Sequence, residues 1–126
     1  MPLKKPEKFD LKVLANLLLE DLEGNWRYIL AFINVVLWTR DEEKVLRLFS
    51  EPDISDPKIK AICASLAEWL AAKKGISIPE WTQKIGPSPE AVYFLPDEAR
   101  GLIMKAFVHS PIAFRKRHIF IASLEA

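Results

Sequence analysis

The chain has 126 residues, half of them hydrophobic, which allows one domain with its own apolar core and excludes an intrinsically disordered protein. The formal net charge is +1, so no global field attracts nucleic acid or an anionic membrane surface. The single cysteine, Cys63, excludes an intramolecular disulfide, and its apolar neighbours indicate a buried side chain.

The first third of the chain predicts a loose arm followed by two helices. Residues 1–8 contain two prolines and no apolar period, so we expect an arm there and no signal peptide. From Asp10, a candidate N-cap, leucines recur every three to four residues up to Gly24, which can close the helix. The Trp26–Trp38 segment is apolar on almost every side but too short to span a bilayer. It is therefore predicted to be the central core helix.

Capping residues mark the next two helices. Thr39 with Glu42 fits a capping box at the start of a short helix. Asp56 followed by Pro57 is a strong helix start, and Gly75 after two lysines supplies the end. The apolar residues between these limits follow helical spacing: Ile59, Ile62, Cys63, Leu66, Trp69 and Leu70.

The second half of the chain reads as short elements separated by proline-containing loops. A short helix is predicted from 79 to 85, a packed apolar loop from 86 to 96, and a helix from Asp97 to Phe107. Ser110-Pro111 then repeats the pattern of a capping residue followed by proline. About two helical turns should follow, and the strand-forming side chains of Ile119–Ile121 predict an extended segment.

No motif in the chain spells out a catalytic or metal-binding site. His109, His118 and Cys63 lack the spacing that brings two metal ligands together. Ser110 is adjacent to His109, but neighbouring helical residues point in different directions. There is no glycine-rich phosphate loop and no nucleophile elbow. We therefore expect neither catalysis nor a cofactor nor a bound metal.

The densest positive charge is the run Arg115-Lys116-Arg117-His118. Cations are favoured at helix C-termini, so a solvated helix end is the simplest interpretation. A surface for a protein partner is the second interpretation, and contact with nucleic acid is the third. Phe114 and Phe120 flank the run and would suit stacking on RNA bases, although anchoring in the core is the favoured reading.

Charge and tryptophan are unevenly distributed along the chain. Residues 41–56 hold six acids and two bases, whereas residues 97–126 hold five bases and three acids. The two regions could face each other or could each meet a charged partner. Of the four tryptophans, three are expected to lie on buried helix faces, and Trp81 beside the proline-rich loop is the one expected to be partly exposed as an interface anchor. Packing of Trp81 under the loop is the favoured alternative.

Four segments in the second half carry a resemblance to a known group of proteins. They are Leu66-Ala67-Glu68-Trp69-Leu70-Ala71, Ile78-Pro79-Glu80-Trp81, Tyr93-Phe94-Leu95-Pro96 and the Ser110–Ile121 segment, which contains Ser-Pro-x-x-Phe-Arg-x-Arg. In this order they resemble small helical bacterial proteins, some of them encoded beside nucleotidyltransferase-type toxins as antitoxin partners. The resemblance covers residues 56–126 and implies a helical fold, no catalysis and a protein partner.

The sequence thus predicts an all-α fold, a single helical domain over residues 1–126 with about six helices and a short extended segment at 119–121. The predicted function is a non-enzymatic, cytoplasmic protein-interaction module, with the antitoxin role implied by the resemblance. The expected partner-binding residues are Phe114, Arg115, Arg117 and His118, with Trp81 and Tyr93 secondary. Alternatives are nucleic-acid binding, a homo-oligomer held by the Trp26–Trp38 helix, and a small helical enzyme. No membrane association is expected.

Overall fold

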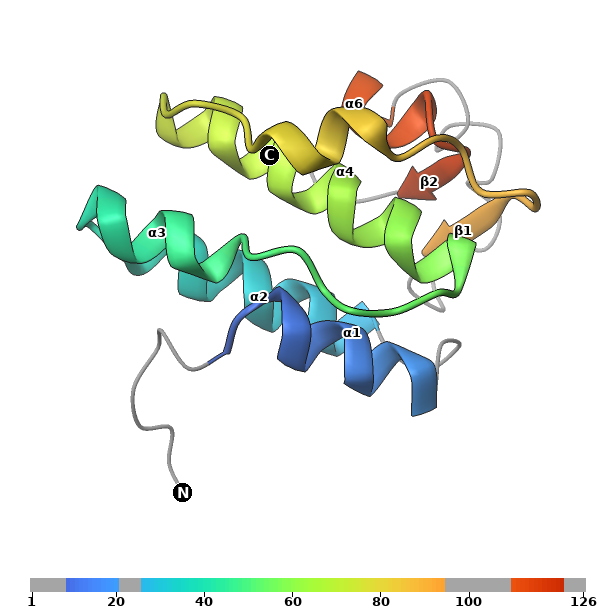
Figure 1. Cartoon of the computed structure of the whole chain (residues 1–126), viewed down its shortest axis with the longest axis horizontal. Coiled ribbons are helices and arrows are strands. Elements are labelled where there is room, and N and C mark those ends of the chain that lie inside the picture. Colours follow the sequence, from blue (N-terminus) through green and yellow to red (C-terminus); the bar gives the residue numbers. More distant parts are fainter. Residues whose placement is uncertain (1–8, 21–25, 95–109, 122–126) are drawn as a thin grey trace.

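The computed structural model describes residues 9–20, 26–94 and 110–121. Within these ranges the chain forms five α-helices, one 3-10 helix and two short strands, so the predicted all-α fold is confirmed (Figure 1). The elements are α1 (Leu11–Glu20), α2 (Trp26–Trp38), α3 (Glu42–Leu48), α4 (Pro57–Lys74), η2 (Glu80–Lys84), β1 (Val92–Phe94), α6 (Ile112–Arg115) and β2 (Ile119–Ile121). The predicted arm at 1–8, the helix end at Gly24 and the helix from Asp97 to Phe107 lie outside the described residues.

Local capping explains where most helices begin and end. The Asp10 carboxylate accepts a hydrogen bond from the Val13 N–H at 3.1 Å, and Asp56 accepts from the Lys58 and Ile59 N–H groups. Gly75 closes α4 in the left-handed conformation, with φ of 72°. The capping box predicted at Thr39 is wrong, because Asp41 is the N-cap of α3 and accepts from the Glu43 N–H.

The central helix of the fold is α4, not α2 as predicted. Helices α1 and α2 pack on one side of α4, whereas η2, α6 and the strands lie on the other (Figure 1). Both sides of α4 therefore have to be apolar, and its small alanines let its neighbours approach closely. Ten of its side chains are buried: Ile59, Ala61, Ile62, Cys63, Ala64, Ser65, Leu66, Ala67, Leu70 and Ala71. Helix α2 buries one side only and leaves Trp38 at its end 78% exposed.

The predicted extended segment is a strand, and it has a partner that the sequence pattern did not indicate. β2 pairs in parallel with β1, with Val92 opposite Ile119 and Phe94 opposite Ile121. Ser110 holds the far end of β2, because its Oγ accepts a hydrogen bond from the Ile121 N–H at 2.8 Å. Ser110 is therefore a tie to the strand, and its predicted role as the side-chain cap of α6 is wrong.

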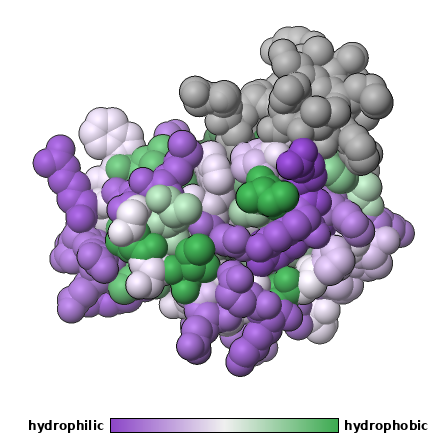
Figure 2. Space-filling view, turned by 90° about the horizontal axis from the view of Figure 1, so that it is seen from above, coloured by the Kyte–Doolittle hydropathy of each residue, from purple (hydrophilic) through white to green (hydrophobic). Residues whose placement is uncertain are grey.

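The outer surface over η2 and α6 is predominantly hydrophilic, with separate hydrophobic patches between charged side chains (Figure 2). Single exposed apolar side chains are common on protein surfaces and need no special role. Among the described residues, none of the helices combines the length and apolar character that a bilayer span requires.

Candidate functional site

The basic run of the sequence lies at the turn between α6 and β2, and its side chains divide between the surface and the interior. Arg115, Lys116 and His118 are exposed. Arg117, which the run places between them, is only 3% exposed. The turn therefore presents three of the four side chains outward and sends the fourth into the protein.

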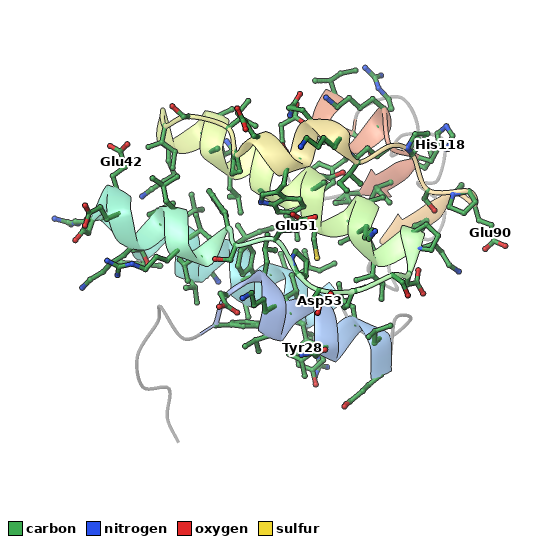
Figure 3. The ribbon with its side chains drawn as sticks, in the orientation of Figure 1. Tyr28, Glu42, Glu51, Asp53, Glu90 and His118 are labelled. Carbon is green, nitrogen blue, oxygen red and sulfur yellow. The ribbon has the colours of Figure 1, made fainter. Side chains whose placement is uncertain are left out.

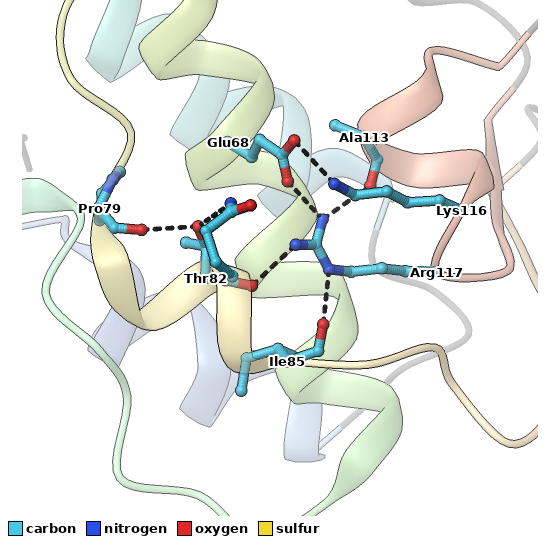
Figure 4. A network of polar contacts seen from close by, with 8 residues as sticks. Glu68, Pro79, Thr82, Ile85, Ala113, Lys116 and Arg117 are labelled. Carbon is cyan, nitrogen blue, oxygen red and sulfur yellow. Dashed lines mark hydrogen bonds and ion pairs between the residues drawn. The ribbon is translucent and has the colours of Figure 1, made fainter.

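Arg117 links its own turn and the adjacent α6 to α4 and to the η2 segment, which lie much earlier in the sequence (Figure 4). Its Nη1 lies 2.9 Å from Oε1 of Glu68 on α4 and donates to the Ala113 carbonyl oxygen at 2.9 Å. Its Nη2 donates to the Thr82 carbonyl oxygen at 2.8 Å, and its Nε donates to that of Ile85 at 3.2 Å. A guanidinium carries five donors in a planar fork, which suits it to hold several carbonyls and a carboxylate at once. The predicted role of Arg117 in contacting a partner is wrong, because its donors are used inside the fold.

Glu68 is the acid on which the basic run converges. Besides Arg117, the Lys116 Nζ lies 2.9 Å from its Oε2. Burial on α4 raises the pKa of Glu68. The hydrogen bonds and positive charges of Lys116 and Arg117 together lower it by more than burial raises it, so the pKa lies below its ordinary value. The carboxylate is therefore held ionised between two cations, in a position with little solvent.

This pKa shift predicts a dependence of stability on pH. A lowered folded-state pKa means that the ionised Glu68 stabilises the fold above its unfolded pKa of about 4.3, and that this contribution disappears as the pH falls through the folded-state pKa. Glu68→Gln is therefore expected to lower the free energy of unfolding at pH 7 by about 2 kcal/mol. The difference from wild type should shrink below about pH 4. Urea unfolding of both proteins at pH 3, 5 and 7 measures it.

The matched control for this experiment is Glu90→Gln. Glu90 also pairs with a lysine, Lys58, at 3.2 Å, but its side chain is largely exposed. Exposed pairs contribute little, so this variant should stay close to wild type at every pH. A Glu68→Gln effect that is as large at pH 3 as at pH 7 would contradict the proposed linkage.

Phe114 is an internal anchor of the same turn. Its ring is fully buried and meets the Trp69 ring edge-to-face, with centroids 5.7 Å apart. The prediction that Phe114 offers an aromatic anchor to a partner is wrong, because no part of the ring is exposed. The alternative reading of Phe114 as a core side chain is confirmed.

His118 has an unusual backbone conformation that reverses the chain between α6 and β2. It is the one described non-glycine residue with positive φ, at 67°. Its carbonyl oxygen accepts from the Val92 N–H at 3.0 Å, and its ring Nδ1 lies 3.0 Å from the Ser88 carbonyl oxygen. Because a carbonyl can only accept, Nδ1 carries the hydrogen of this bond. The imidazole is thus exposed but held in one orientation.

The two secondary candidates lie elsewhere. Trp81 on η2 is half-buried against the core, and its Nε1–H donates to the Phe49 carbonyl oxygen at 2.9 Å. Trp81 is thus partly exposed and packs against the core, because η2 lies along α4. The prediction that Trp38 lies on a buried helix face is wrong, because this side chain at the end of α2 is 78% exposed. Tyr93 lies in β1, opposite Phe120 in the register; its side chain is outside the described part of the structure.

The acidic segment 41–56 is not the partner of the basic run. Glu42 lies at the opposite end of the molecule from His118, and Glu51 and Asp53 lie along the middle of it (Figure 3). Lys116 and Arg117 pair with Glu68 of α4 instead. Sequence reasoning did not single out Glu68, although a signal was present: it is the only charged residue between 61 and 72 in an otherwise apolar helix.

The described residues contain no group of three or more histidine, cysteine or acidic side chains placed to bind a metal ion. Cys63 is fully enclosed by the core, and burial raises the pKa of its thiol to about 12. A thiol with so high a pKa is not a nucleophile at neutral pH. Cys63 is therefore not a candidate catalytic residue. The turn between α6 and β2 is the candidate site, because Arg115, Lys116 and His118 on it face solvent.

No protein-family model matches the chain, and no curated protein or solved structure matches it either.

Proposed function

We propose that this chain is a non-enzymatic protein-binding module that presents the turn between α6 and β2 to its partner. We call this surface the basic edge and define it as Arg115, Lys116 and His118. The observation that carries the proposal is the way the two neighbouring side chains are fixed: Phe114 is buried against Trp69, and Arg117 is bound to α4, η2 and α6. The edge is therefore preorganised, which lowers the conformational cost of binding.

A protein partner fits this edge better than nucleic acid does. Affinity for nucleic acid grows with the number of cations that neutralise phosphates. Here Arg117 is buried, and Lys116 shares Glu68 with it, so the run offers less exposed positive charge than its sequence suggests. A short, fixed edge with charge-assisted donors suits a defined acidic patch on a protein surface.

The resemblance described above indicates the class of partner. It implies a toxin of the nucleotidyltransferase type encoded beside this chain, with this chain acting as its antitoxin. Such a partner would have to offer carboxylates at the surface that meets Arg115 and His118. An antitoxin of this kind masks its target by binding, so it needs no catalytic group of its own.

The experiment that tests the proposal is co-purification of the tagged chain with the product of the adjacent gene. Arg115→Glu reverses an exposed charge on the edge and should weaken binding about tenfold. His118→Asn removes the imidazole and keeps a residue that tolerates positive φ, so it should also weaken binding without unfolding the turn.

Arg47→Glu is the matched control, because Arg47 is an exposed arginine on α3, away from the basic edge. It should leave the affinity unchanged. Retention of the partner by a folded Arg115→Glu variant would contradict the proposal, as would an equal loss with Arg47→Glu. Steeply salt-dependent binding of the wild-type chain to DNA or RNA would favour the nucleic-acid alternative instead.

A further inference from the structure

Helix α2 leaves one side without a covering element among the described residues. Its inner side is buried through Ile29, Phe32, Ile33 and Val36. Its outer side carries three exposed large apolar side chains: Leu30, Leu37 and Trp38. Helix α2 lies on the opposite side of α4 from α6 (Figure 1), so this surface is separate from the basic edge. Contiguous exposed apolar surface of this kind marks interaction sites.

Asn34, which is itself exposed, lies between the apolar residues of this outer side, with Leu30 before it and Leu37 and Trp38 after it. At 100° per residue, Arg27, Leu30, Asn34, Leu37 and Trp38 share about a third of the helix circumference. Leu30 and Trp38 lie four residues before and after Asn34, about 6 Å along the axis in each direction. The helix therefore presents exposed apolar side chains on both sides of one polar residue.

The charges at the two ends are opposite. Arg27 lies seven residues before Asn34, and Asp41 lies seven residues after it, three residues beyond the end of α2. Glu42 and Glu43 follow Asp41 and are also exposed, so the three acids at this end outnumber its two exposed bases, Arg40 and Lys44. A surface with apolar side chains on both sides of its centre and opposite charges at its ends can pair with a copy of itself turned by 180°.

We propose that a second copy of this chain docks on the outer side of α2, with the two α2 helices antiparallel and the two-fold axis at Asn34. Leu30 then faces Trp38 of the second copy, and Arg27 faces the acidic end that begins with Asp41. Asn34 meets its own equivalent, where two amide groups can exchange hydrogen bonds. Such an interface is isologous, as in most cyclic dimers.

The helix length sets the strength of this dimer. Thirteen residues extend about 20 Å, so one helix face buries less than the roughly 800 Å² per partner of a standard interface. The dimer should therefore dissociate on dilution. Trp38, at 78% exposure, is the side chain with the most surface to bury, and tryptophan is common among residues that dominate binding energy.

Sedimentation of the full chain across a concentration series tests the proposal. The mass should rise from the monomer value of 14.4 kDa toward twice that value as concentration increases. Trp38→Glu should hold the chain at the monomer mass. Ile112→Glu is the matched control, because Ile112 is 63% exposed on α6, and it should dimerise as wild type does. A chain that stays monomeric at the highest concentration overturns the proposal, and so does a dimer that Trp38→Glu leaves intact.

Two single-cysteine additions test the orientation. The one natural cysteine, Cys63, is buried and does not interfere. Asn34→Cys should form a disulfide-linked dimer on mild oxidation, because position 34 meets itself at the two-fold axis. Arg27→Cys should not, because its two copies would lie about 21 Å apart. Cross-linking of Arg27→Cys, or failure of Asn34→Cys, overturns the antiparallel arrangement. Neither result bears on the basic edge, which lies on the other side of the molecule.

Discussion

Replacing Arg117 with alanine is expected to lower the free energy of unfolding by about 3–5 kcal/mol, measured by urea denaturation at pH 7. The change leaves the Glu68 carboxylate, whose side chain is only 15% exposed, with one cation instead of two. It also removes the donors to the carbonyl oxygens of Ala113, Thr82 and Ile85. Buried groups that lose their partners keep the desolvation cost and lose the compensating bond.

The control is Arg47→Ala, which removes the same side chain from an exposed pair. Arg47 Nη2 lies 3.8 Å from Glu43 Oε1, and both side chains are largely exposed. Such pairs contribute about 0.2–1 kcal/mol, so this variant should unfold close to wild type. Equal losses in the two arginine variants would show that Arg117 does not act as an internal tie.

Phe114→Ala is expected to destabilise the chain by a similar amount, about 3–5 kcal/mol. It opens a cavity between α6 and α4 and removes the edge-to-face contact with Trp69. The same denaturation experiment measures the loss, and near-ultraviolet circular dichroism should report the changed surroundings of Trp69. Ile112→Ala, on the exposed side of the same short helix, should change stability by less than about 0.5 kcal/mol. A Phe114→Ala variant as stable as wild type would contradict the anchoring role.

Much of the helical framework could be predicted from the sequence, because its signals are local. Asp10, Asp56 and Gly75 act within four residues of where they stand, so their residue types alone indicate helix limits. The spacing of apolar residues likewise identified α4 and its core-facing character.

Which helix lies at the centre of the fold could not be predicted in the same way. Composition alone made α2 look like the helix buried on all sides, whereas α4 occupies that position with many small alanines. Whether an apolar surface is covered depends on which elements fold against it. For the outer side of α2 the chain itself supplies no covering element among the described residues, which is why a second copy is proposed there.

It could have been predicted in part which side chains of the basic run face solvent and which face the interior. Phe114 and Arg117 are three residues apart and so share one side of a helical turn, whereas Arg115 points away from both. Once Phe114 is taken as a core residue, Arg117 is directed inward with it. The acid that receives it was not predictable, because Glu68 lies almost fifty residues earlier and only the packing of α6 on α4 brings the two together.

The parallel pairing of β1 with β2 was missed for a related reason. Strand β1 has three residues and follows a proline-containing loop, so its own sequence carries little periodicity. Its place is fixed by the turn at His118, whose carbonyl oxygen begins the pairing with Val92. A histidine at positive φ gives no signal comparable to that of glycine.

The central claim is that one basic run serves two purposes, with Arg117 holding the fold and Arg115 and His118 forming the surface. A double-mutant cycle between Glu68 and Arg117 tests its foundation most directly, using the unfolding free energies of Glu68→Gln, Arg117→Ala and the double variant at pH 7. We expect a coupling energy of about 2 kcal/mol or more, because the two side chains form one largely buried ion pair at 2.9 Å. Effects that add to within about 0.3 kcal/mol would contradict the claim, because they would mean that the two residues act independently.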